Sequence, residues 1–170
     1  MKLWIIDADL IIDFLALEIL DKLVQKHTIF LATSVIDEVK FYRKDGIKIQ
    51  IDFRETYIES GLIKELEAAQ NEIKEVLECL PSDFEDSIHI GELESLAILK
   101  REKGLIFCCC DHFAIRALPF IDCSDRGIST EKLLNSCGLS LPRSKLKDRH
   151  TEDYFQNNLR LGQEKKIYNF

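Results

Sequence analysis

Hydrophobic positions recur along the chain with two different spacings, and segments of the two kinds alternate. Short apolar runs at 2–7, 28–32 and 105–110 have the composition of buried parallel strands. A further short run at 120–123 predicts a last strand, and weak alternation at 47–60 predicts a small extended hairpin. Apolar residues at helical spacing predict helices between these segments, at 10–24, 34–40, 62–80, 91–103, 111–118 and 130–137.

This order of elements predicts an α/β fold. Strands that alternate with helices form a parallel sheet covered on both faces, which is a three-layer α/β/α arrangement. Residues 143–161 are polar, partly basic and helical in pattern, so we expect a C-terminal helical tail. The chain then divides into a main domain at 1–139, with an acidic helical insert at about 47–90, and a tail at 140–170.

Composition sets the class of protein. The chain has 170 residues, of which 46% are apolar and 31% charged, which fits one globular domain and excludes a disordered chain. No apolar run approaches the roughly 20 residues of a membrane span. Asp7 and Asp9 interrupt the first apolar stretch, so we expect neither a signal peptide nor a membrane anchor, and a cytoplasmic location. The six cysteines are then expected to be reduced thiols.

Charge is distributed unevenly. The net charge of −7 argues against a simple electrostatic nucleic-acid binder. Residues 140–170, however, carry seven Lys or Arg and four Asp or Glu, so the tail is basic and the rest of the chain acidic. The tail either docks its apolar side on the body, as amphipathic helices usually do, or adds contacts to a nucleic-acid backbone.

Two predicted strands end in an aspartate, Asp7 and Asp111. The carboxyl ends of strands mark the binding crevice of open α/β sheets, so both side chains are expected there. Each could equally be the N-cap of the helix that follows. Glu38 lies late in a helix, and Glu92 and Glu94 open another, where an acid also favours the helix dipole.

Several carboxylates that converge on one crevice repel one another and raise one another's pKa. Such a group persists where a divalent cation neutralises it. Ligands that are all carboxylate oxygens suit Mg²⁺ or Mn²⁺ rather than Zn²⁺. The cysteines at 108–110 are consecutive and lack the spacing of a zinc site or of a Cys-x-x-Cys redox motif, which argues against a thiol-based redox protein.

Four stretches of the chain resemble the PIN-domain family of metal-dependent ribonucleases, which includes the toxins of VapC-type toxin–antitoxin pairs. The resemblance runs from residue 3 to about 139. Each motif alone is short, but the four occur in the family's order and on the expected elements. They are WIIDADLIIDFL (4–15), ATSVIDEV (32–39), GELESLAIL (91–99) and CDHFAIR (110–116).

The resemblance implies four acidic catalytic residues. The first falls on Asp7, the second on Glu38 and the fourth on Asp111. The third falls on Glu92, with Glu94 as its rival, because small residues follow the family's acid at set distances and neither glutamate matches fully. The two lie about 200° apart on a helix, so both cannot point the same way. Asp7, Asp111 and the third acid would bind metal, and Glu38 would act through water.

Other residues match the family less closely. A Thr or Ser usually stands two residues before the last acid, where this chain has Cys109. Arg116 lies one and a half turns beyond Asp111 and would bind a substrate phosphate, or else pair with an acid at the surface. Asp9 and Asp13 are expected to cap the helix or face solvent.

The family's activity implies a Mg²⁺- or Mn²⁺-dependent endoribonuclease that leaves a 5′-phosphate and a 3′-hydroxyl. We therefore expect RNA as substrate, an antitoxin protein as partner, and a homodimer. The alternative is a catalytically inactive PIN-like module that binds RNA or acts as a scaffold. Cys109 and the ambiguous third acid favour this alternative.

Overall fold

The computed structural model describes residues 3–85, 87–139 and 141–168, so Lys2 of the predicted first strand lies outside the described residues. Five parallel strands form a central sheet in the order β5-β2-β1-β6-β7. The bounds of its strands are β1 (Leu3–Ile6), β2 (Thr28–Ala32), β5 (Ile63–Leu66), β6 (Leu105–Cys108) and β7 (Gly127–Ile128).

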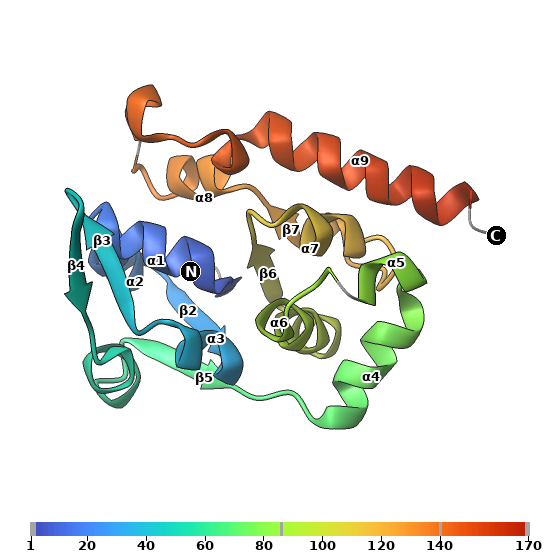
Figure 1. Cartoon of the computed structure of the whole chain (residues 1–170), viewed down its shortest axis with the longest axis horizontal. Coiled ribbons are helices and arrows are strands. Elements are labelled where there is room, and N and C mark those ends of the chain that lie inside the picture. Colours follow the sequence, from blue (N-terminus) through green and yellow to red (C-terminus); the bar gives the residue numbers. More distant parts are fainter. Residues whose placement is uncertain (1–2, 86, 140, 169–170) are drawn as a thin grey trace.

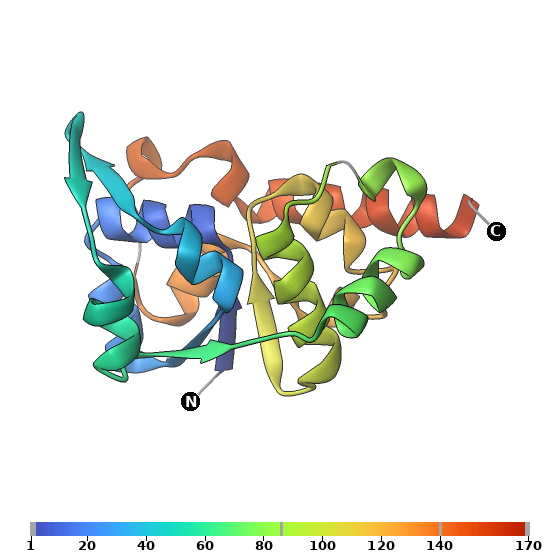
Figure 2. The ribbon, with the colours of Figure 1, turned by 60° about the horizontal axis from the view of Figure 1, so that its bottom comes forward.

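Helices lie along the sheet and around its ends (Figures 1 and 2). Helix α6 packs on β1, β2 and β6, and α2 packs on β2, which is compatible with the predicted three-layer α/β/α architecture. The helices are α1 (Ala8–Ala16), α2 (Leu20–Lys26), α3 (Thr33–Glu38), α4 (Gln70–Cys79), α5 (Ser82–Glu85), α6 (Ile90–Arg101), α7 (His112–Ala117), α8 (Thr130–Ser136) and α9 (Glu152–Tyr168).

Burial explains why the central elements carry continuous apolar runs. Trp4, Ile5 and Ile6 of β1 are all at most 1% exposed, since a parallel strand in the middle of a covered sheet has no solvent face. All residues from Leu93 to Leu99 in α6 are buried as well, because α6 lies between the sheet on one side and α3 and α4 on the other.

Several predicted elements differ from the structure. The predicted helix at 62–80 divides into strand β5 and helix α4, so the expected helical insert supplies an edge strand of the central sheet. Its apolar spacing suits a helix, but pairing of Ile63–Leu66 with β2 overrides that local preference. The predicted strand at 120–123 is a turn, and the last strand is β7.

The predicted hairpin is displaced. It is formed by β3 (Phe41–Lys44) and β4 (Ile47–Gln50), joined at Asp45 and Gly46, both of which have positive φ. The rest of the 47–60 stretch is largely a π-helical segment at Arg54–Glu59. The predicted helix at 10–24 is two helices, since the chain turns at Glu18, whose φ is 57°.

The C-terminal residues pack against the main body. Short 3₁₀ turns at Arg143–Lys145 and Asp148–His150 precede α9, which lies along α7 and α8 (Figure 1). Phe155 of α9 is 2% exposed and closes over Gly127, where a Cβ would lie 2.6 Å from the ring. The docking interpretation of the tail therefore describes α9, although the helix begins nine residues later than predicted.

We predict that Gly162→Ala destabilises the protein. A Cβ at 162 would lie 2.8 Å from Cα of Arg116 on α7, and this backbone cannot move aside as a flexible side chain would. Overpacking of this kind costs about 1–3 kcal/mol, whereas alanine in an exposed helix stabilises by about 1 kcal/mol relative to glycine. Chemical unfolding measures the sign, with the exposed neighbour Gln163→Ala as control. Stabilisation by Gly162→Ala would show that α9 does not pack this closely on α7.

Candidate functional site

The sheet reverses its strand order between β1 and β6. From β1 the chain adds β2 and then β5 on one side, and β6 and then β7 on the other. In open α/β sheets, ligands bind outside the carboxyl ends of the strands at this point of reversal. Asp7 directly follows β1 and Asp111 lies three residues beyond β6, so both predicted acids lie at this edge of the sheet.

Asp7 is both a cap and a buried acid. Its Oδ1 accepts a hydrogen bond from Leu10 N of α1 at 2.8 Å, and its Oδ2 accepts one from Cys110 N at 3.0 Å. The side chain is 3% exposed, and this burial raises its pKa to about 6, although the thiol of Cys109 and the two N–H donors oppose the shift. The capping interpretation is thus correct for Asp7, and it coexists with an energetically unfavourable buried charge.

Asp111 caps α7 through a 2.9 Å hydrogen bond from Ala114 N to its Oδ1. Its other oxygen lies 3.8 Å from Nδ1 of His112. Cys109 links the two strand-end acids, since its sulfur accepts from Asp111 N at 3.2 Å and its thiol bonds to the Asp7 carboxylate. The residue that departs from the family pattern therefore still contacts both acids.

A cavity of about 540 Å³ opens at this edge, and its lining includes Glu38, Glu92 and Asp111. Asp7 itself is buried, but it contacts two residues of the lining: Ala8 follows it in the chain, and Cys110 N donates to its Oδ2. Gly91 lets α6 approach α3, because a Cβ at 91 would lie 3.0 Å from Oε1 of Glu38.

Glu92 has the most perturbed carboxyl group among the residues that line this cavity. Burial, then the charges of Asp111 and Asp7, raise its pKa to about 7, although its hydrogen bond from His89 N opposes the shift. That bond is 2.6 Å long and forms a capping box at the start of α6. The shift shows that Glu92, Asp111 and Asp7 interact electrostatically. Partial burial also raises the pKa of Glu38.

The structure separates Glu92 from its rival. Glu94 is 5% exposed and points away from the cavity, where its carboxylate accepts hydrogen bonds from N and Oγ of Ser34 and from Ala68 N. It therefore joins α3, α6 and the loop after β5. The two glutamates are separated by about 200° around the helix axis, so Glu92 faces the cavity and Glu94 faces this junction.

We predict that Glu94→Gln destabilises the protein more than Glu92→Gln. A glutamine amide offers one acceptor oxygen where Glu94 uses both carboxylate oxygens, so at least one donor loses its partner, at about 1–3 kcal/mol. Glu92 accepts one backbone hydrogen bond, which a glutamine can also accept. Urea unfolding of the two variants gives the comparison, and a larger loss in Glu92→Gln would contradict these assignments.

Arg116 does not line the cavity. Its Nε donates to Oδ1 of Asn158 on α9 at 2.9 Å, so it is part of the contact between α7 and α9. The cation that lines the cavity is Arg149, which sequence analysis did not select. Its guanidinium bonds to Asp9 at 2.7 Å and to Asp13 at 2.9 Å, and its buried Nε has no hydrogen-bond partner among the residues that the structure describes.

Asp13 was expected to cap or to face solvent, and this is wrong. It is 9% exposed and accepts hydrogen bonds from Lys147 Nζ at 2.6 Å and from Arg149. Nε2 of His150, itself 1% exposed, lies 2.9 Å from the same carboxylate. We call this group of four side chains the Asp13 cluster; it fixes residues 147–150 to α1.

Side chains at this edge do not converge into a ready metal site. Among residues 3–85, 87–139 and 141–168, no three His, Cys, Asp or Glu side chains are close enough together to hold an ion. The hydrogen bonds explain this, since Glu92 is turned back to His89 N and both oxygens of Asp7 accept backbone N–H groups.

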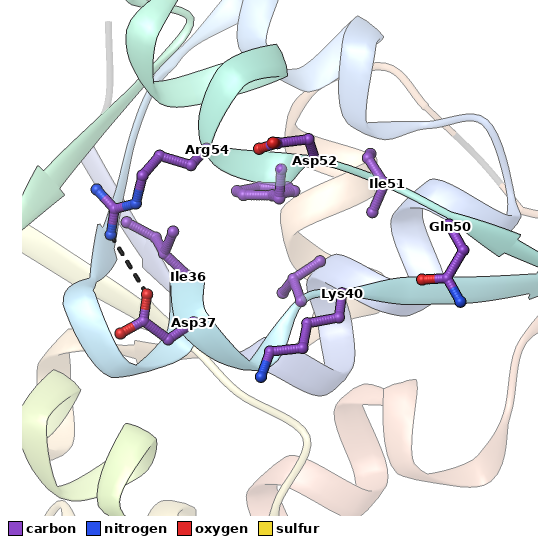
Figure 3. Close-up of a pocket in the computed structure, with 9 residues that line it drawn as sticks. Ile36, Asp37, Lys40, Gln50, Ile51, Asp52 and Arg54 are labelled. Carbon is purple, nitrogen blue, oxygen red and sulfur yellow. Dashed lines mark hydrogen bonds and ion pairs between the residues drawn. The ribbon is translucent and has the colours of Figure 1, made fainter.

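A neighbouring cavity of about 450 Å³ lies between α3 and the end of β4 (Figure 3). Its arginine and its two carboxylates are already in use: Arg54 pairs with Asp37 and, more closely, with Glu65 outside the cavity. Asp52 accepts from Glu55 N and so begins the π-helical segment. These contacts give the cavity a structural explanation.

Comparison of the chain with protein-family models, with curated proteins and with solved structures finds no match. The described helices include none with the length and apolar character needed to cross a bilayer.

Proposed function

We propose that the chain is a metal-dependent endoribonuclease whose active site is the cavity lined by Glu38, Glu92 and Asp111. The observation that carries this proposal is that Asp7 and Asp111 lie at the strand reversal, where Asp111, Glu38 and Glu92 line one cavity. The resemblance to PIN-domain ribonucleases supports it, since that resemblance selects the same four acids.

The chemistry of the candidate ligands suits a divalent cation. All the candidate ligands are carboxylates, which suit Mg²⁺ or Mn²⁺. The raised pKa values of Asp7 and Glu92 mean that the protein alone does little to stabilise their negative charges, which a bound cation would neutralise. Asp7, Glu92 and Asp111 would hold the ion, with Glu92 released from His89 N. When bound, such ions activate a water molecule and neutralise charge on a phosphodiester.

The chain's own groups would orient the reactants. Cys109 and the backbone N–H groups of Leu10 and Cys110 hold the Asp7 carboxylate in one orientation, and Ala114 N holds Asp111. Glu38, which also lines the cavity, would hold the attacking water by accepting a hydrogen bond from it. Fixed carboxylates of this kind need little reorganisation when the reaction occurs.

The inactive PIN-like module is the second candidate. It is favoured by the hydrogen bond that turns Glu92 back onto His89 N and by the weak hydrogen-bonding capacity of Cys109. A module of this type would bind RNA without cutting it.

An RNA cleavage assay with Mg²⁺ or Mn²⁺ separates the candidates. Wild type should release products with 5′-phosphate ends, and both EDTA and Asp111→Asn should stop the reaction. Asp153→Asn, an exposed position in the first turn of α9, is the matched control and should cut normally. RNA that is bound but left intact by wild type would favour the inactive module. Equal cleavage by Asp111→Asn would refute the site.

The toxin role, the antitoxin partner and the homodimer belong to this proposal. If the chain acts as a toxin, expression of wild type should arrest growth and expression of Asp111→Asn should not. Light scattering on the purified protein tests the homodimer.

A further inference from the structure

A separate cavity of about 380 Å³ lies farther along α1 than the 540 Å³ cavity lined by Glu38, Glu92 and Asp111, which we call the carboxylate cavity. One wall is formed by the second half of α1, from Ile12 to Ala16, and by Leu17 after it, and the other walls are β3 and the segment at 145–147. Both ribbon views place the β3–β4 hairpin and the 143–150 segment beside α1 (Figures 1 and 2).

The charge of this cavity is opposite to that of its neighbour. Arg43, Lys145 and Lys147 line it, with Asp13 as the one carboxylate among its lining residues, already paired with Lys147. The carboxylate cavity instead has four acids and one arginine in its lining. A polyanion that approaches this acidic protein is therefore attracted to the basic cavity first.

The basic cavity also offers an aromatic surface. Phe41 is 38% exposed, and Nζ of Lys48 lies 3.9 Å from the centroid of its ring. Phe41 pairs with Gln50 and Arg43 with Lys48 in the hairpin, so Phe41, Arg43 and Lys48 share one face. Aromatic rings that stack on bases, next to cations that neutralise phosphates, are the usual means of binding single-stranded nucleic acid.

The two cavities are close enough to hold one strand. They share α1, with Asp9 at one cavity and the residues from Ile12 onward at the other. They also share the C-terminal segment, with Arg149 at one and Lys145 at the other. At a rise of about 1.5 Å per residue, the separation along α1 is roughly 5–12 Å. Stacked nucleotides advance by about 3.4 Å each, so this is a span of two or three nucleotides.

We propose that the cavity between α1, β3 and residues 145–147 binds a nucleotide of single-stranded RNA, with its base on Phe41 and its phosphate between Arg43 and Lys145. The strand would then continue along α1 to the carboxylate cavity. This inference rests on the proposed ribonuclease function for its choice of RNA as ligand, and it names the form of RNA that the site accepts.

The test is binding of a fluorescein-labelled oligouridylate, measured by fluorescence anisotropy in EDTA, so that metal at the carboxylate cavity plays no part. Phe41→Ala should weaken binding about five- to hundredfold, the usual loss for a stacked base. Arg43→Gln and Lys145→Gln should each lower the salt dependence of log K by about 0.7. Lys74→Gln on α4, whose side chain is 76% exposed, is the matched control and should bind like wild type.

Three results would overturn the inference: no binding of the oligouridylate by wild type in EDTA, equal binding by Phe41→Ala and wild type, or equally tight binding of a duplex RNA. The cleavage assay reports separately on the proposed function. If wild type cuts no RNA but the cavity variants bind the oligouridylate more weakly than wild type does, the nucleotide site is supported and the nuclease is rejected. Normal RNA cleavage by wild type, together with unchanged oligouridylate binding by the cavity variants, would support the nuclease and reject the nucleotide site.

Discussion

Asp7→Asn is expected to lower metal-dependent RNA cleavage on the order of a thousandfold or more. In the proposed nuclease Asp7 is a charged metal ligand, and its loss would remove a cation whose stabilisation of the transition state amounts to several kcal/mol, where each 1.4 kcal/mol is about tenfold in rate. Asparagine keeps the size of the side chain and can still accept from Leu10 N to cap α1. A folded, inactive variant is therefore the expected result, measured by initial cleavage rates in Mg²⁺.

The same variant tests the buried charge through pH. Burial raises the pKa of Asp7 from 3.8 to about 6, so between these values the folded protein binds more protons than the unfolded chain. The free energy of unfolding of the metal-free protein should then fall as pH rises from about 4 to about 6. At about 1.4 kcal/mol for each pH unit, Asp7 contributes roughly 3 kcal/mol to this fall. Glu92, with its pKa at about 7, extends the fall to neutral pH.

Asp7→Asn removes this dependence but leaves Cys110 N without its acceptor, at about 1–3 kcal/mol. The variant should therefore be less stable than wild type at pH 4 and equally or more stable at pH 8. Urea unfolding in EDTA at both pH values gives the comparison, with Asp153→Asn as control. An equal loss at both pH values would mean that Asp7 acts as a cap without a strained charge.

Local pattern was sufficient to predict the acids at the strand ends. An apolar run that ends in aspartate identifies a strand and its carboxyl end together, and parallel strands bring those ends to one edge. The choice between Glu92 and Glu94 needed the structure, because both lie in the first turns of α6 and only packing shows which faces Ser34. The strand at Ile63–Leu66 was mistaken for a helix, since short apolar runs fit both spacings.

The remainder of the site depends on contacts across nearly the whole chain. Arg149 meets Asp9 and Asp13 from 140 and 136 residues away in sequence. The residues around Arg149 belong to the stretch that was predicted to be helical, but 3₁₀ turns form this segment, and the helix begins only at Glu152. A charge count showed that the tail was basic, but it gave no indication that much of its charge pairs with acids of the body.

Asp13→Asn is expected to reduce the free energy of unfolding by about 3–5 kcal/mol, the usual result when one partner of a buried ionic group is removed. The carboxylate receives hydrogen bonds from Lys147, Arg149 and His150, and asparagine would turn an NH₂ group toward these donors. Nδ1 of His150 accepts from Lys147 N at 3.3 Å, which places the ring proton on Nε2, facing Asp13. Few donors of the Asp13 cluster would therefore keep a partner.

The way in which stability depends on pH distinguishes the Asp13 cluster from the carboxylate cavity. Burial raises the pKa of Asp13, but the hydrogen bonds from His150, Lys147 and Arg149 outweigh burial and hold the pKa well below its usual range. Its stabilisation is therefore complete above the unfolded pKa of about 3.8 and is lost as pH falls further, which is opposite to the trend for Asp7. Wild type and Asp13→Asn should differ most at pH 5–7 and converge in strong acid.

Thermal and urea unfolding measure this difference, and Glu18→Gln is the matched control. Glu18 pairs with Lys44 at 2.6 Å, but its side chain is 73% exposed, and exposed pairs contribute at most about 1 kcal/mol. At about 2–4 °C for each kcal/mol, Asp13→Asn should lower the Tm by on the order of 10 °C, while Glu18→Gln changes it little. Similar Tm values for the two variants would mean that solvent replaces the Asp13 cluster without loss. In that case α9 alone, through Phe155 and Gly162, holds the C-terminal residues on the body.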